Sequence, residues 1–219
     1  MSSDSISFLK LPENPDSHSA YRSLILGSTS RYRRDLLQRL QIPFDTIAPN
    51  VDETSLDGEI PAKLAARLAL AKARAVAHLF PDSVVIGADQ VADLDGLALG
   101  KPGSHERAVL QLRQMRGQTV IFQTAVAVVC LASGFEQSGL AAVRVKFRDF
   151  DDDEIENYLR AEQPYDCAGS AKSEGLGISL LASIESDDPT ALIGLPLIRT
   201  CSLIRAAGVN LWVQHKAVL

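Results

Sequence analysis

One short segment near the start of the chain gathers hydroxyl and guanidinium groups. In LILGSTSRYRRDLL, residues 24–37, an apolar run stops at a glycine, three hydroxyl residues follow, and three arginines then fall within four positions. A strand that leads through such a loop into a helix can bind an anion. The backbone N–H groups at the start of the helix have no partner within it, and the positive end of the helix dipole lies there. Arginine adds bidentate contacts to phosphate oxygens. Either the segment binds phosphate, or it is a capped helix with a solvated basic first turn, in which case the basic residues oppose the dipole at some cost.

Two further segments carry polar side chains among small residues. In VVIGADQVADLDGLALGKP, Asp89 and Gln90 come just past the expected end of a buried strand, and Lys101 follows a tight turn. Open α/β sheets keep their ligands at the carboxyl ends of strands, although an aspartate there also serves as a turn or cap residue. In CAGSAKSEGLGI, Lys172 and Glu174 lie among small residues that let the backbone approach a ligand closely. Each segment alone is weak evidence for a site.

The elements that must position these residues follow from the apolar pattern. Strands are expected at residues 23–27, 44–49, 83–89, 118–131 and 141–150, the last two joined through 132–139. Helices are expected at residues 30–40, 60–80, 104–115, 151–160 and 190–208. Ser30 is expected to cap the first helix, and Gly208 to end the last one. Strand and helix alternate in the first half and two long strands follow, which predicts an α/β fold with a mixed sheet.

Composition excludes several classes of protein. The 219 residues carry a net charge of −5, so no overall basicity draws the chain to nucleic acid. Cys130, Cys167 and Cys201 are far apart and form no CxxC motif, which argues against a disulfide framework or a thiolate zinc site and favours a reducing compartment. The longest apolar stretch is too short to span a bilayer. Residues 1–22 are polar, and we expect a flexible extension ahead of one cytoplasmic domain at 23–219.

Taken in order, several segments resemble one known family. The segments STSRYRR, APNVDET, LALAKARAV, GADQVADLDGLALGKP and YDCAGSAKSEGLGI…GLPLI resemble the Maf family of nucleoside triphosphate pyrophosphatases over residues 23–210. The pairing of DQV with AGSAKSEG is similar to the subgroup that acts on 7-methyl-GTP, whereas the dTTP/UTP subgroup typically has Thr after the aspartate and Gln in the later motif. Two positions depart from the pattern: Arg31 replaces the usual Pro, and Tyr32 replaces the Trp typical of the 7-methyl-GTP subgroup.

The resemblance implies a fold and a reaction. The fold is Maf/ITPase-like, a mixed twisted sheet flanked by helices with a central substrate cleft. The reaction is hydrolysis between the α and β phosphates, giving a nucleoside monophosphate and pyrophosphate with Mg²⁺ or Mn²⁺ as cofactor. By match to the family motifs, the residues at the phosphates are Ser28, Ser30, Arg33, Arg34, Lys72, Lys101 and Lys172. Glu53 and Asp89 are the candidate metal ligands, and Asp89 is the expected general base. The alternative for Asp89 is a role that is only structural or only metal-binding. The alternative for Lys72 is a place on a solvated helix face without contact to substrate.

The base pocket follows from the chemistry of 7-methylguanine. Its ring carries a positive charge, which attracts an electron-rich aromatic face such as that of Tyr32. Its N1–H and N2–H₂ edge presents donors, for which Glu174 is a suitable acceptor, and Gln90 could complement a remaining polar edge. The alternative for Tyr32 is core packing, because Tyr32, Leu36 and Leu40 share one helical stripe.

Three functions therefore stay open. The first is a hydrolase acting on acid anhydrides that removes 7-methyl-GTP from the nucleotide pool. The second keeps the chemistry but acts on dTTP and UTP. The third is a non-catalytic regulator of cell division (septum formation), which would have no need of Asp89 or Glu53. The expected partner is the nucleotide substrate, without nucleic acid or membrane; the resemblance allows a homodimer, but the sequence does not set the oligomeric state.

Overall fold

The computed structural model describes residues 22–212. The polar extension expected at residues 1–22 lies, except for Arg22, outside the described residues. Within the described range, none of the helices combines the length and the apolar character that crossing a bilayer requires.

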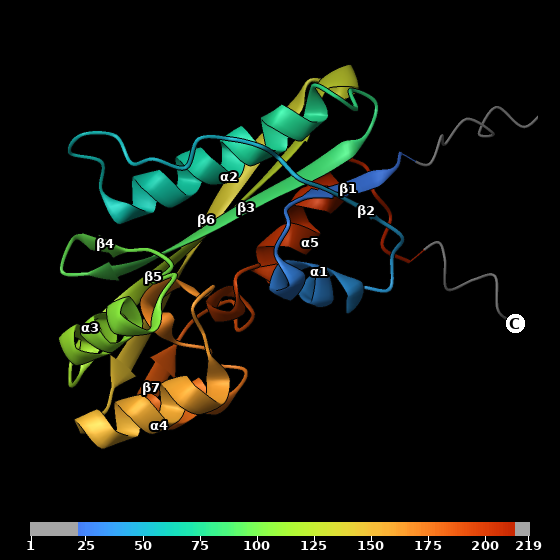
Figure 1. The fold of residues 1–219 in the computed structure, drawn as a ribbon. Coiled ribbons are helices and arrows are strands. Elements are labelled where there is room, and N and C mark those ends of the chain that lie inside the picture. Colours follow the sequence, from blue (N-terminus) through green and yellow to red (C-terminus); the bar gives the residue numbers. More distant parts are fainter. Residues whose placement is uncertain (1–21, 213–219) are drawn as a thin grey trace, which may run out of the picture.

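The described residues form a mixed sheet of seven strands (Figure 1). The strands are β1 (Leu24–Gly27), β2 (Asp45–Ile47), β3 (Val84–Leu94), β4 (Leu97–Leu99), β5 (Thr119–Cys130), β6 (Phe135–Phe147) and β7 (Leu181–Glu185). They lie in the order β2-β1-β3-β5-β6-β7, with β4 paired to β3 outside this path. β1 is parallel to β2 and β3, whereas the pairs β3–β5, β5–β6 and β6–β7 are antiparallel. The mixed α/β sheet predicted from the sequence is confirmed.

Helices cover both faces of this sheet. They are α1 (Arg31–Gln38), α2 (Pro61–Ala77), α3 (His105–Met115), α4 (Asp152–Glu162) and α5 (Leu197–Ala206). α2 packs on alternate residues of the central strands, such as Val85 and Ala127. α1 and α5 pack on the intervening residues, such as Ile86 and Val128, and α3 and α4 pack further along the same strands. Because successive side chains of a strand point to opposite faces, α2 lies on one face and α1, α3, α4 and α5 on the other (Figure 1).

Local sequence explains where the helices begin. Ser30 is the N-cap of α1, as predicted, and its Oγ accepts a hydrogen bond from the backbone N–H of Arg33 at 3.4 Å. α4 begins with a capping box in which Asp151 and Glu154 each accept from the other's backbone N–H. α2 has no side-chain cap, but Pro61 stands in its first turn, where a missing N–H leaves no hydrogen bond unmade.

Two of the expected strand boundaries are wrong. β3 continues to Leu94 instead of ending at Asp89, because β5 pairs with it antiparallel through residue 93. β6 runs from Phe135 to Phe147 instead of from 141 to 150, so five of the eight residues expected to form the connection at 132–139 are strand. β4 and β7 were not expected, since three and five residues carry too little pattern to distinguish a strand from a loop.

The closing helix expected over residues 190–208 is interrupted in the structure. It consists of a short 3₁₀ helix (Ala191–Ile193), a turn, and then α5. Gly194 has φ 123°, a conformation incompatible with a continuous helix, and Pro196 offers no N–H to the preceding turn. Gly208 follows the end of α5 with φ 89°, as a helix-terminating glycine does.

α2 lies directly against β3 at Gly87. A β-carbon at this position would stand 2.2 Å from the Ala69 carbonyl oxygen and 2.5 Å from the Ala73 backbone nitrogen. The facing side of α2 is correspondingly small, since Ala69 and Ala73 are fully buried. Lys72 belongs to the same turn of α2, and the close approach brings it next to β3.

On the side of β3 that faces β1 and β4, the middle of the strand is unpaired, which leaves a gap in the sheet. β1 pairs with β3 at residues 84–87, and β4 pairs with it at 92–94. Between these two, no strand within residues 22–212 pairs with β3 along this edge. Asp89 and Gln90 lie in the gap and, as neighbours in a strand, point to opposite faces of the sheet. Asp89 contacts α2, and Gln90 contacts the 191–193 turn.

Candidate active site

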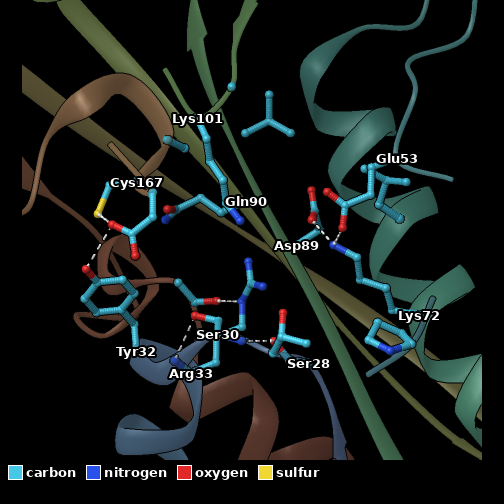
Figure 2. A pocket seen from close by; sticks show the side chains of 18 of the residues that line it. Ser28, Ser30, Tyr32, Arg33, Glu53, Lys72, Asp89, Gln90, Lys101 and Cys167 are labelled. Atoms are coloured by element: carbon cyan, nitrogen blue, oxygen red, sulfur yellow. Dashed lines mark hydrogen bonds and ion pairs between the residues drawn. The ribbon is translucent and has the colours of Figure 1, made fainter. Parts of the chain in front are cut away.

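A cavity of about 750 Å³ opens at the gap beside β3. Its walls come from the β1–α1 loop, the 48–55 segment, α2, the middle of β3, and the segments around residues 100, 166–174 and 192–194. The predicted site residues that line it are Ser28, Ser30, Tyr32, Arg33, Glu53, Lys72, Asp89, Gln90, Lys101 and Glu174. Figure 2 shows Tyr32 and Cys167 on one side of the cavity, and Glu53, Lys72 and Asp89 on the opposite side. The structure thus brings together residues that lie far apart in the sequence.

The β1–α1 loop presents donors at one end of the cavity. The Ser28 Oγ accepts a hydrogen bond from the Ser30 N–H at 3.1 Å, which fixes the turn into α1. The Arg33 Nε donates to the Gly194 carbonyl at 2.9 Å, and neither terminal nitrogen of this guanidinium has a hydrogen-bond partner among the described residues. Burial lowers the pKa of Arg33, while nearby carboxylates offset part of the effect. A half-buried cation with free donors at a helix N-terminus fits an anionic ligand.

Lys72 joins two carboxylates on the α2 side of the cavity. Its Nζ lies 2.6 Å from the Asp89 Oδ1 and 2.6 Å from the Glu53 Oε1 (Figure 2). The Lys72 and Asp89 side chains are 5% and 10% exposed, whereas that of Glu53 is 56% exposed. Burial works to raise the pKa of Glu53, but the hydrogen bond and charge of Lys72 outweigh it, so this pKa lies below its ordinary value. Lys72 on a solvated helix face and Asp89 as a turn residue are therefore wrong.

The segment that carries Glu53 is fastened to α2 by Arg67. The Arg67 guanidinium makes two hydrogen bonds of 2.7 Å to the Glu59 carboxylate, and it also donates to the Thr54 carbonyl at 3.0 Å. The hydrogen bonds from Arg67 hold the pKa of Glu59 down to about 2. These contacts hold the segment from Thr54 to Glu59 against α2, directly after Glu53.

The donor set on this side suits a hard divalent cation. Within residues 22–212, no three His, Cys, Asp or Glu side chains are grouped as a complete metal site. Mg²⁺ commonly takes only one or two carboxylates from the protein and completes its coordination with substrate phosphates and water. Glu53 and Asp89 provide two carboxylates on one cavity wall. The residues present therefore fit a metal that binds together with a phosphorylated substrate.

The Gln90 amide is held in one orientation on the other face of β3. Its Nε2 donates to the Thr124 Oγ1 at 3.0 Å and to the carbonyls of Ala191 and Leu192 at 2.9 and 3.0 Å. Thr124 is buried on β5 directly opposite Gln90, and its hydroxyl also donates to the Ala191 carbonyl. Carbonyl oxygens accept only, so the nitrogen must face them. Gln90 lines the cavity, and its Oε1 has no hydrogen-bond partner among the described residues, so this oxygen is the amide atom available to accept from a ligand.

Tyr32 lines the cavity instead of packing in the core. Its hydroxyl accepts a hydrogen bond from Arg31 at 2.7 Å and donates one to the Asp166 Oδ1 at 3.2 Å. Leu36 is buried among core residues, but Tyr32 takes no part in that cluster. The core-packing alternative for Tyr32 is therefore wrong. Burial raises the pKa of the Tyr32 hydroxyl, which remains protonated at neutral pH.

Two predicted substrate-binding residues do not reach the cavity wall. Arg34 projects to the surface, where its Nε lies 3.6 Å from an Asp35 carboxylate oxygen. Lys172 is paired with Glu162, whose carboxylate also accepts the Leu176 N–H at 2.8 Å. Lys172 therefore ties the loop around Glu174 to α4. Contacts of these two residues with a substrate stay predictions.

Several polar residues of the cavity were not singled out from the sequence. They are Thr29, Arg31, Asn50, Ser55, Asp166 and Cys167. Asp166 and Cys167 directly precede the AGSAKSEG motif, and that position was the available signal for them. Burial, with the charges of nearby Asp166 and Glu174, raises the pKa of the Cys167 thiol to about 12, so it is not a thiolate nucleophile.

Comparisons with known proteins identify the family of this chain. The family model described as Maf-like protein matches residues 23–207. A 7-methyl-GTP pyrophosphatase of Polaromonas sp. (strain JS666 / ATCC BAA-500) is 77% identical over 194 residues, which are 89% of this chain and 89% of that protein. Proteins of the same name from Albidiferax ferrireducens and Methylobacillus flagellatus are 69% and 54% identical, over 86% and 85% of this chain and 95% and 97% of their own lengths. The chain belongs to the Maf family.

Proposed function

We propose that the protein is a nucleoside triphosphate pyrophosphatase that hydrolyses 7-methyl-GTP to 7-methyl-GMP and pyrophosphate. The observation that carries the chemistry is the buried carboxylate of Asp89, held by Lys72 in the same cavity as the Arg33 guanidinium. The observation that carries the substrate is the shared name of relatives 77% and 69% identical to the chain.

The chain's own residues support a simple displacement. Arg33 and the free N–H groups at the start of α1 bind phosphate oxygens, and Lys101 adds a further cation to the cavity. Lys72 holds the Oδ1 of Asp89, which leaves Oδ2 to accept a proton from water. The water oxygen forms a bond to phosphorus as the bridging α–β bond breaks, and pyrophosphate leaves. A divalent cation held by Glu53 and Asp89 would neutralise phosphate charge during this step.

The other end of the cavity suits the methylated base. 7-Methylguanine is a flat cation whose N1–H and N2–H₂ edge carries donors. Gln90 offers a fixed acceptor oxygen, Glu174 offers a carboxylate, and Tyr32 offers an aromatic face. Uracil and thymine present mainly carbonyl acceptors. Gln90 and Glu174 also offer acceptors, so they cannot form hydrogen bonds with these carbonyl groups. The chemistry of this end therefore favours 7-methylguanine, and the reaction would remove a modified nucleotide from the pool.

A panel of substrates tests the proposal. The full chain is assayed with 7-methyl-GTP, GTP, ATP, CTP, UTP and dTTP in the presence of Mg²⁺ or Mn²⁺, and pyrophosphate and orthophosphate are measured separately. Release of pyrophosphate from 7-methyl-GTP at the highest kcat/KM is the expected result. Preference for UTP and dTTP would place the protein in the alternative subgroup. Orthophosphate as the only product, or no turnover of any triphosphate, would contradict the proposed reaction.

A further inference from the structure

Among the residues that line the cavity, Tyr32 and Cys167 both contact Asp166, and Glu174 lies near enough to act on the Cys167 thiol. Two of these four side chains are carboxylates, and neither has a role in the phosphate chemistry proposed above. This group of residues lies opposite the Glu53, Lys72 and Asp89 cluster, as the positions of Tyr32 and Cys167 in Figure 2 show. It will be called the acidic corner.

Asp166 is held so that one of its oxygens remains available. Its Oδ1 accepts the hydrogen bond from the Tyr32 hydroxyl at 3.2 Å and lies 3.6 Å from the Cys167 sulfur. Its Oδ2 has no hydrogen-bond partner among residues 22–212. A carboxylate fixed through one oxygen beside an aromatic ring can accept an N–H from a flat ligand through the other.

The charges around the acidic corner favour a cationic ligand. The carboxylates of Asp166 and Glu174 both act on the Cys167 thiol and raise its pKa, which places their negative charges around one point. Two cations lie beside Tyr32: Arg31, bound to the Tyr32 hydroxyl, and Lys172, which is paired with Glu162. The carboxylates of Asp166, Glu174 and Glu162 thus outnumber these two cations by one.

The Tyr32 ring already has cations beside it. The Arg31 Cζ lies 4.8 Å from the ring centroid, and the Lys172 Nζ lies 6.0 Å from it. Both side chains keep hydrogen-bonded partners of their own, the Tyr32 hydroxyl and the Glu162 carboxylate. Neither cation pairs with the free oxygen of Asp166 in the described part of the chain.

From this arrangement we infer that Asp166 is a specificity-determining residue, whose free oxygen accepts an N–H of the purine and whose charge favours the N7-methylated, cationic base over neutral guanine. The inference rests on the proposed function and names a further residue of the same site. Asp166 is exposed, so water and salt screen its charge. The expected contribution to discrimination is accordingly modest, about twofold to fivefold in the ratio of kcat/KM values.

The substitution Asp166→Asn tests the charge while keeping the shape and an oxygen that can accept from Tyr32. The measured quantity is the ratio of kcat/KM for 7-methyl-GTP to that for GTP, together with the Kd values of 7-methyl-GMP and GMP by calorimetry. The ratio should fall about twofold to fivefold, through weaker binding of the methylated nucleotides. Asp149→Asn, which removes the same charge from an exposed position outside the cavity, should leave the ratio unchanged.

A double-mutant cycle separates recognition from positioning. Tyr32→Phe keeps the aromatic ring but lacks the hydroxyl that Asp166 binds. If Asp166 acted only by orienting Tyr32, Tyr32→Phe would lower the kcat/KM ratio as much as Asp166→Asn does. The double mutant would then have the same ratio as either single mutant. We expect Asp166→Asn to lower the ratio in the Tyr32→Phe background as well. In the wild type the preference should also shrink as KCl is added, and in Asp166→Asn it should depend less on salt.

The outcomes distinguish this inference from the proposed function. If the wild type shows no preference for 7-methyl-GTP over GTP, the proposed substrate is wrong. If the wild type has the preference and Asp166→Asn retains it fully, with unchanged Kd values, only the role of Asp166 is wrong. Equal losses for both nucleotides in Asp166→Asn would also overturn the inference, because they would mean that Asp166 does not discriminate between the bases.

Discussion

Replacing Asp89 with Asn isolates the basicity of the central carboxylate. Asparagine keeps the size of the side chain and an oxygen that can accept the 2.6 Å hydrogen bond from Lys72. Glu53 remains as a charged partner of Lys72, so the buried lysine is not left without a carboxylate. The change therefore removes a negative charge and a proton acceptor with little disturbance of packing. Loss of general-base catalysis should lower kcat by roughly 10²- to 10⁴-fold, equivalent to about 2.7–5.5 kcal/mol in the activation barrier.

The assay is pyrophosphate release from 7-methyl-GTP at saturating Mg²⁺. Binding of an analogue with a methylene group between the α and β phosphates should largely survive in Asp89→Asn, because Arg33 and the α1 loop are intact. Glu53→Gln is the matched control, since it removes the other carboxylate on Lys72 but leaves the base. We expect raised Mg²⁺ to restore much of the activity of Glu53→Gln but not that of Asp89→Asn. Turnover within threefold of the wild type in Asp89→Asn, or its rescue by metal, would refute the assignment of Asp89 as the base.

Further predictions concern the metal, the base, one ion pair and acid stability. EDTA should abolish pyrophosphate release, and Mg²⁺ or Mn²⁺ should restore it; full turnover after exhaustive chelation would contradict the metal proposal. Tyr32→Ala should lower kcat/KM for 7-methyl-GTP more than for GTP, by up to about thirtyfold, and Glu174→Gln should move the preference toward UTP and dTTP; equal losses for all triphosphates would contradict both roles. Lys172→Met should lower the free energy of unfolding by roughly 1–3 kcal/mol in urea titrations, because its partner carboxylate is largely buried. Arg67 holds the pKa of Glu59 at about 2, below the ordinary 4.5, so the stabilisation is present above pH 4.5 and is lost as the pH falls toward 2. Arg67→Met should lack this component, which unfolding curves at stepwise lower pH would detect.

Local patterns account for the parts of the site that the sequence could predict. The hydroxyl cap at Ser30 and the buried strand before Asp89 depend on neighbouring residues only, and both are present in the structure. The choice between Arg33 and Arg34 does not. Successive residues of a helix point about 100° apart, so the arginine that faces the cavity depends on how α1 is rotated by its buried side, which carries Leu36 and Leu37.

Long-range contacts set the remaining parts, and no local pattern reports them. The Gln90 amide is oriented by carbonyl groups about a hundred positions later in the chain, and Lys172 is drawn to Glu162 rather than to the cavity. Asp89 was expected past the end of a strand, but the strand that ends there is β1, the neighbour of β3. The position of the site was thus predicted for a partly wrong reason, since pairing between strands cannot be derived from either strand alone.

The contact at Gly87 constrains how this site can evolve. Most crowded positions in a core tolerate a larger residue once a neighbouring side chain becomes smaller. At Gly87 the atoms that a β-carbon would meet belong to the backbone of α2, and its facing residues are already alanines. Backbone atoms are the same in every residue, so no second substitution can remove the carbonyl oxygen or the amide nitrogen that a side chain would meet. A side chain at position 87 therefore fits only if the helix moves. Moving the helix would draw Lys72 away from Asp89. A substitution at position 87 would therefore act mainly by disturbing the ion pair at the centre of the cavity, and less by disturbing the packing of the core.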